Sequence, residues 1–158
     1  MRYYNYYNFK FCSLGIAEKE SAICCVFFNT DCVPEGHKKY ESPLICNAAS
    51  QLEEYFEGKR KEFDLPLTFH GTQFKIKVWE AVLSIPYGET RSYGDIAKMI
   101  DNPKASQAVG RTNHTNQIAI IVPCHRVIGH DGSIVGYAGG IELKQKLLDH
   151  EKANRCKC

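Results

Sequence analysis

The chain has 158 residues, of which 44% are hydrophobic and 24% are charged, and its net charge is +2 at pH 7. This length and composition predict an ordinary globular protein with one core or two small domains. No apolar run approaches the length of a membrane span, and the start of the chain is too polar for a signal peptide. We therefore expect no membrane contact and a cytoplasmic protein, nucleoid-associated or nuclear depending on the organism.

Eight cysteines in a secreted chain of this size would suggest disulfides. Without an export signal, reduced thiols are the better expectation. Cys24, Cys32, His37 and Cys46 are the residues to weigh as zinc ligands, but their spacing fits no compact paired-ligand pattern. We expect no metal and interpret the three cysteines of this set as reduced core residues.

The first third of the chain predicts strands followed by a helix. Aromatic and polar residues alternate from Tyr3 to Phe11, and an apolar run follows at 23–28, which indicates antiparallel strands with a turn near Leu14-Gly15. Apolar residues then recur at helical spacing over 44–56, and Gly58 is a C-terminal cap.

A charged segment at 58–62, followed by Pro66, is typical of a linker. We place a domain boundary there, giving one domain at 1–65 and a second at 66–158. Lys and Arg are outnumbered by Asp and Glu, 8 to 10, in residues 1–70, and outnumber them 12 to 8 in residues 71–158. The mildly basic second half permits a nucleic-acid partner without requiring one.

The second domain carries three helix start signals. Thr72 is a good N-cap for an amphipathic helix, and Ser92 with Asp95 forms the pattern of a capping box. Asn102 followed by Pro103 predicts the start of a third helix that runs to Arg111. Two short helices joined by a tight turn predict a helix-turn-helix.

The last of these helices is rich in small residues, namely Ala105, Ser106, Ala108 and Gly110. Small side chains allow a close approach to another surface, and they are equally suited to tight packing inside the protein. The pattern alone leaves both interpretations open.

The β-branched run at 120–122 predicts a buried strand, which Pro123 ends. Cys124 follows at once, with His125 and Arg126 beside it. A neighbouring imidazole and guanidinium favour the thiolate, so this pattern indicates a nucleophile. The alternative is a small buried hydrophobic residue. A Gly-rich loop at 129–140 and a last helix from Ile141 to about His150 complete the domain.

Together with the Pro-Cys-His-Arg-Val motif, several segments between about Thr72 and Glu151 resemble the O6-alkylguanine-DNA alkyltransferases, also called methylated-DNA–protein-cysteine methyltransferases. The segments that carry the resemblance are Trp79, Pro86-Tyr87-Gly88-Glu89-Thr90, Ser92-Tyr93, Asn102-Pro103-Lys104-Ala105, Ala108-Val109-Gly110, Asn116 and Gly136-Tyr137-Ala138-Gly139-Gly140.

The resemblance implies an α+β fold, with a small N-terminal ribonuclease-H-like α/β domain and a mainly helical, winged-helix-like C-terminal domain that holds the helix-turn-helix. It implies a DNA-repair methyltransferase that flips an O6-alkylguanine out of duplex DNA and moves the alkyl group irreversibly to its own cysteine. Such a protein acts once, without a cofactor, and as a monomer. Activity on O4-alkylthymine stays open.

The resemblance also assigns roles. Cys124 is the nucleophile, His125 reaches it through a water, Glu151 orients the histidine, and Tyr93 protonates the leaving guanine at N3. Lys144 supports the nucleophile, and Asn116 links the helix-turn-helix to the active-site loop. The expected DNA-binding residues are Ser92, Tyr93, Ala105, Ser106, Gln107, Ala108, Gly110, Arg111 and Arg126. The expected pocket residues are Val135, Gly136, Tyr137 and Ala138.

One residue departs from the family pattern. Relatives usually have an arginine that fills the space left by the flipped nucleotide, and this chain has Gln107. We expect weaker DNA binding or slower repair as a result. Two other functions remain open at this point: a sensor that binds alkylated DNA without transfer, and a cysteine hydrolase that uses Cys124, His125 and Glu151.

Overall fold

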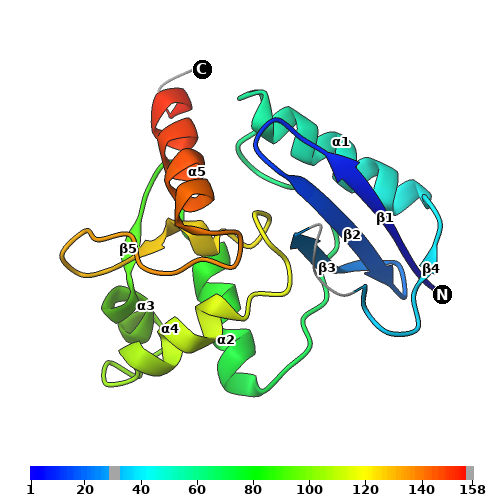
Figure 1. The fold of residues 1–158 in the computed structure, drawn as a ribbon. Helices are drawn as coiled ribbons and strands as arrows, with labels where there is room; N and C mark the ends of the chain where they lie inside the picture. The colour runs from blue at the N-terminus through cyan, green and yellow to red at the C-terminus, as the bar shows by residue number, and fades with distance from the viewer. Residues whose placement is uncertain (29–32, 156–158) are drawn as a thin grey trace. The chain divides into compact units, whose positions relative to one another are not determined.

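The structure, a computed structural model, describes residues 1–28 and 33–155 (Figure 1). The chain forms two compact units. The first contains residues 1–70 together with 117–119, and the second contains residues 71–116 and the chain from residue 120 onward. Sequence reasoning placed the boundary a few residues earlier, at 65/66. In the described part of the chain, no helix is long and apolar enough to span a bilayer.

The first unit is built on a four-stranded sheet with the order β3-β2-β1-β4. Strand β2 pairs antiparallel with both β1 and β3, and β4 pairs parallel with β1. The strands are β1 (Arg2–Asn8), β2 (Ser13–Lys19), β3 (Ala22–Phe28) and β4 (Lys38–Lys39). Successive residues of β1 point to opposite faces of the sheet, so its four tyrosines lie on both faces, and all of them are half-buried.

Helix α1 (Pro43–Phe56) packs against this sheet (Figure 1). Ser42 caps it by accepting a hydrogen bond from the Ile45 N–H, and the proline lies in the first turn, where no donor is needed. Gly58 follows the helix with a φ of +77° and donates to the Tyr55 carbonyl, which confirms the predicted C-terminal cap. Leu52, Tyr55 and Phe56 are buried on its inner face.

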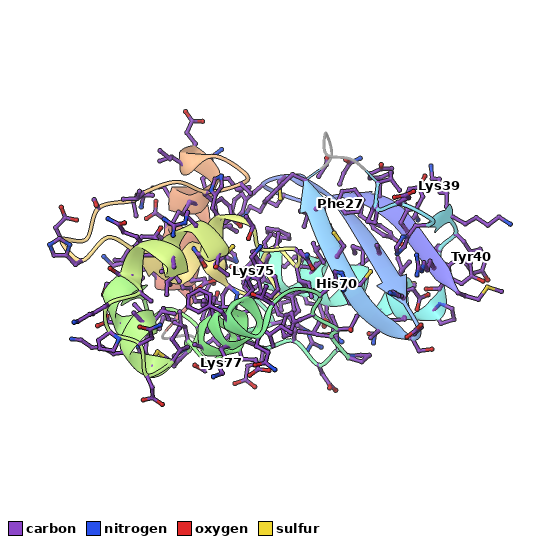
Figure 2. The ribbon with its side chains drawn as sticks, turned by 90° about the horizontal axis from the view of Figure 1, so that it is seen from below. Phe27, Lys39, Tyr40, His70, Lys75 and Lys77 are labelled. Carbon is purple, nitrogen blue, oxygen red and sulfur yellow. The ribbon has the colours of Figure 1, made fainter. Side chains whose placement is uncertain are left out.

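The turn that we predicted near Leu14-Gly15 was wrong. The chain turns between Phe9 and Cys12, where the Phe9 N–H donates to the Cys12 carbonyl, and Gly15 lies inside β2. Phe27 explains the glycine: its ring lies directly over Gly15, and a Cβ there would be 2.3 Å from the ring. Figure 2 labels Phe27 on β3 and Lys39 on β4. The glycine marks a close approach and not a turn.

Residues 117–119 complete the first unit from far along the chain. Val26 accepts from the Ala119 N–H at 3.0 Å and donates to the Gln117 carbonyl at 2.8 Å, forming a short parallel bridge to β3. The prediction of a buried strand at 120–122 was therefore right about burial and wrong about the strand. These residues are buried, but Ile120 has a φ of +69° and the chain turns at 120–121.

The second unit is mainly helical and carries a small two-stranded parallel sheet of β5 and β6. Thr72 and Ser92 cap their helices, as predicted. The capping box is complete, because the Ser92 side chain accepts from the Asp95 N–H and the Asp95 carboxylate accepts from the Ser92 N–H. The elements are α2 (Gln73–Leu83), β5 (Arg91–Ser92), α3 (Tyr93–Met99), α4 (Ser106–His114), η1 (Cys124–Arg126), β6 (Val127–Ile128) and α5 (Ile141–Asn154). Figure 2 labels Lys75 and Lys77 on α2.

Two helix boundaries differ from the prediction. Helix α4 starts at Ser106 and not after Asn102, because residues 102–105 form a separate turn in which the Ala105 N–H donates to the Asn102 carbonyl. Helix α5 continues beyond His150, which places Glu151 on its buried face. Helices α3 and α4 contact each other as a helix-turn-helix, and the α+β class and the two-part architecture are confirmed.

Candidate active site around Cys124

Cys124 begins η1, a single turn of 3₁₀ helix, directly after Pro123. The residue is only 4% exposed. Burial raises the pKa of its thiol to about 11, while a hydrogen bond from Asn116, the charge of Lys144 and a hydrogen bond from Tyr137 act in the opposite direction. The resting group is therefore a neutral thiol, surrounded by groups that favour its anion.

Two asparagines near the end of α4 hold the cysteine in place. Asn116 Nδ2 donates to the Val122 carbonyl at 3.0 Å and lies 3.1 Å from Cys124 Sγ. Asn113 Nδ2 donates to the Cys124 carbonyl at 3.2 Å. Sequence reasoning missed Asn113, because nothing in the sequence separates it from other polar residues of a short helix.

His125, Arg126 and Glu151 form a buried ionic network. His125 Nε2 lies 2.5 Å from Glu151 Oε2, and Arg126 Nε donates to Glu151 Oε1 at 2.7 Å. The Gly88 amide also donates to Oε1, at 3.2 Å. One carboxylate on α5 thus orients both residues that follow the cysteine.

The electrostatics of this network follow from its burial. Burial lowers the pKa of His125, although the contact with Glu151 opposes the shift. Burial works against an ionised Glu151, but His125 and Arg126 outweigh it and hold the pKa of this carboxyl below its ordinary value. The stable arrangement is a neutral imidazole whose Nε2–H faces a carboxylate, and its lone pair is then on Nδ1.

Arg126 does not lie where we predicted it. We expected this side chain at the DNA surface, but the residue is 6% exposed. Its NH1 donates to the Ile85 carbonyl at 2.7 Å, and its guanidinium lies 5.5 Å from the centre of the Tyr87 ring. Together with the bonds to Glu151, these contacts make Arg126 an internal residue that phosphate cannot reach.

Tyr93 and Lys144 converge on the loop that follows η1. The Tyr93 hydroxyl donates to the Val135 carbonyl at 3.1 Å, and Lys144 Nζ donates to the same oxygen at 3.0 Å and to the Gly136 carbonyl at 3.2 Å. Burial raises the pKa of Tyr93 and lowers that of Lys144. Lys144 is fully buried, so its charge is little screened, and it acts to lower the pKa of Cys124.

A cavity of about 1020 Å³ opens between α4 and this loop. Eight of the predicted residues line it, and Tyr137 also bonds the thiol, so the cavity wall reaches the nucleophile. These eight are Tyr93, Ser106, Gln107, Gly110, Arg111, Val135, Gly136 and Tyr137. Ser92, Ala105, Ala108 and Ala138 are outside the lining. The lining residues that sequence reasoning missed include Asn113, Thr115, His130 and Asp131.

The cysteines of the first unit do not form a metal cluster in the described part of the chain. Cys24 Sγ lies 3.5 Å from His37 Nε2, and Cys46 is exposed on α1. Cys24 is only half-buried and Cys46 is exposed, so the expectation that these cysteines lie in the core was wrong. Cys32 lies outside the described residues.

Comparison with known proteins gives the same assignment for both parts of the chain. The family model for the DNA binding domain of 6-O-methylguanine DNA methyltransferase matches residues 73–153, and the model for the ribonuclease-like domain of that family matches residues 2–69. A constitutive methylated-DNA–protein-cysteine methyltransferase of Bacillus subtilis is 44% identical over 158 residues, covering 94% of this chain and 96% of the relative.

Two solved structures agree. The crystal structure of Mycobacterium tuberculosis O6-methylguanine methyltransferase has a TM-score of 0.90 at 42% identity, covering 98% of this chain and 94% of that one. A structure of the M. tuberculosis OGT protein in complex with DNA has the same TM-score and identity over 96% of this chain and 94% of that one. The resemblance seen in the sequence is confirmed, and the chain belongs to the 6-O-methylguanine DNA methyltransferase family.

Proposed function

We propose that this protein repairs DNA by moving the alkyl group of an O6-alkylguanine to Sγ of Cys124. The observation that carries the proposal is the buried thiol, which is held by Asn116 and by Tyr137, and Tyr137 itself lines a cavity beside α4. Its similarity to methylated-DNA–protein-cysteine methyltransferases supports the reaction, and the DNA-bound relative supports the partner.

The site contains the groups that such a transfer needs. Neutral His125 takes the thiol proton through a water, with Glu151 fixing the ring. Sγ then bonds to the alkyl carbon, the bond from that carbon to O6 breaks, and its electron pair stays on the guanine. Tyr93 gives its hydroxyl proton to N3 of the leaving base, and the proton held by His125 replaces it. The thioether is stable, so each molecule acts once.

Lys144 and the Val135 carbonyl prepare the site for this charge movement. The positive charge of Lys144 stabilises the thiolate before transfer, and it lies in a buried place where the interaction is strong. The Tyr93 hydroxyl must leave the Val135 carbonyl to reach a base. We therefore propose that base entry into the cavity displaces this hydrogen bond.

We propose that the protein binds duplex DNA containing O6-alkylguanine through α4, as a monomer, in the compartment that holds the chromosome. Gln107 and Arg111 are exposed on α4. Ser106, Ala108 and Gly110 have small side chains, so little projects from the helix between them. A helix with small side chains suits the narrow minor groove. Gln107 would fill the gap that the flipped nucleotide leaves, without adding a charge.

The test is transfer of a labelled methyl group from an O6-methylguanine duplex, with the Cys124→Ser variant in parallel. We expect the label to rise to about one methyl per protein, to stop there, and to be absent in the variant. Binding of the lesion without transfer would instead favour the sensor function. Turnover on ester or peptide substrates, with the thiol regenerated, would favour the hydrolase.

A further inference from the structure

We infer that Arg126 is a positioning residue for the transfer reaction: it neutralises the Glu151 carboxylate, and His125 therefore stays an uncharged base. The inference rests on the proposed function, in which His125 accepts the thiol proton. It concerns a residue that sequence reasoning had assigned to DNA.

The contacts of Arg126 are those of an internal counter-ion. Its Nε and NH2 atoms donate to the two carboxylate oxygens of Glu151, at 2.7 Å and 3.1 Å, in a two-pronged arrangement. NH1 donates to the Ile85 carbonyl, and the guanidinium carbon lies over the Tyr87 ring, 5.5 Å from its centre. The side chain is thus fixed on several sides and kept from water.

The charges around His125 can be counted from each neighbouring element. Helix α5 provides the carboxylate of Glu151 and the ammonium group of Lys144, and η1 provides Arg126 and the neutral thiol of Cys124. The ring of Tyr137 meets the imidazole edge-on, with centroids 6.5 Å apart. Among these described groups, Arg126 cancels Glu151, and Lys144 leaves the surroundings positive before His125 takes up any proton.

A proton on His125 would therefore add a second uncompensated positive charge to a buried place. The pKa of His125 is lowered by burial first, and the charges of Arg126 and Lys144 act in the same direction, against Glu151. Without Arg126, Glu151 would be a buried anion with His125 as its nearest partner. The imidazole would then bind a proton to form an ion pair, and it could no longer accept one from the thiol.

Three substitutions separate charge from shape. Arg126→Met removes the charge and keeps an unbranched side chain. Arg126→Gln does the same and keeps a donor, and it is measured in parallel in case the methionine variant does not fold. Arg126→Lys keeps the charge. Arg60→Met is the matched control, because Arg60 forms an ion pair with Glu54 at 3.0 Å in the other unit.

The primary measurement is the pKa of His125. It is obtained from an NMR titration of the imidazole in each folded variant, without DNA. We expect the pKa to rise by roughly one unit or more in Arg126→Met and Arg126→Gln, and to stay near the wild-type value in Arg126→Lys and Arg60→Met. The second measurement is single-turnover methyl transfer as a function of pH. The acid limb of this profile should move to higher pH with the His125 pKa in the charge-removing variants. Their transfer rate should therefore fall, relative to wild type, about tenfold more at low pH than at high pH.

The inference is overturned if the His125 pKa does not change in the charge-removing variants, or if Arg126→Lys raises it as much as Arg126→Met. A rate that falls equally at all pH values would also overturn it, because it would indicate a purely structural ion pair. A wild-type protein that transfers no methyl group would sink the proposed function instead, and the NMR titration would still report on Arg126.

Discussion

The side-chain nitrogen of Asn116 lies 3.1 Å from Sγ of Cys124 while it also donates to the Val122 carbonyl at 3.0 Å. One amide group therefore fixes the chain before the cysteine and stabilises the anion that the cysteine must become. Residue 116 follows α4 and precedes the turn at 120–121, so the helix expected to meet DNA is joined to the nucleophile through very few residues.

Replacing Asn116 with Asp should slow transfer more than replacing it with Leu. Both variants lose the donor to Sγ, but the carboxylate also places a negative charge beside the thiolate and raises its pKa further. We expect a loss of at least about tenfold at neutral pH for Asn116→Asp, partly recovered as the pH rises. Single-turnover methyl transfer at several pH values measures this. Equal losses in the two variants at every pH would show that the amide acts only on the backbone.

The Glu151→Gln substitution should reveal a pH-dependent contribution to stability. The pKa of Glu151 is lower in the folded state than in the unfolded state, so its contribution is complete above the unfolded value and is lost as the pH falls toward the folded value. We expect the variant to lose about 3–5 kcal/mol of unfolding free energy at neutral pH, because Arg126 is left buried without its carboxylate. The difference from wild type should shrink as the pH falls below about 4.5.

Urea unfolding of both proteins between neutral and acidic pH measures that difference. Glu57→Gln is the control, since Glu57 pairs with Lys59 at 2.7 Å on the surface, where an ion pair contributes little. A difference between wild type and Glu151→Gln that does not depend on pH would contradict the assignment of an ionised Glu151.

Gln107→Arg should strengthen DNA binding. The side chain is exposed on α4 at the cavity, and a guanidinium there adds a phosphate or base contact that the amide cannot make. We expect tighter binding, a salt dependence steeper by about one counterion, and faster transfer. Gln73→Arg adds the same charge at the exposed start of α2 and serves as the control. If both variants behave alike, the gain reflects net charge and not the position of residue 107.

Gly15→Ala should destabilise the first unit. The new Cβ would lie 2.3 Å from the Phe27 ring, so the ring or the strand must move, which costs about 1–3 kcal/mol. Chemical denaturation measures the loss, and adding Phe27→Leu should recover part of it. Gly94→Ala is the control, because the nearest atom there is Ser92 Oγ at an ordinary 3.7 Å. A Gly15→Ala protein as stable as wild type would mean that the ring is free to shift.

Local chemistry explains which parts of the fold could be predicted. The capping box at Ser92 and Asp95, and the glycine cap after α1, depend on residues three or four positions apart, so their signals are complete in the sequence. The helix-turn-helix and the position of Cys124 followed from such signals and from the family resemblance.

The misses share a different cause, because each depends on a partner that is distant in the sequence. Arg126 is internal because Glu151 and Ile85 receive its hydrogen bonds. Gly15 is a packing residue because Phe27 comes from the next strand. A β-branched run such as 120–122 is equally apolar in a strand and in a buried turn, and only the bridge from Ile118 to Val26 shows where the chain must bend.

That bridge also sets the order in which the protein can be completed during synthesis. The Val26 amide and carbonyl form these hydrogen bonds with Gln117 and Ala119, which leave the ribosome only after most of the chain has been made. Residues 66–68 already pair with Ile23 at the start of β3, but the edge of β3 at Val26 stays unpaired during that interval. A chain cut after residue 70 would leave the Val26 part of this edge permanently unpaired, and aggregation through it is the expected fate of such a fragment.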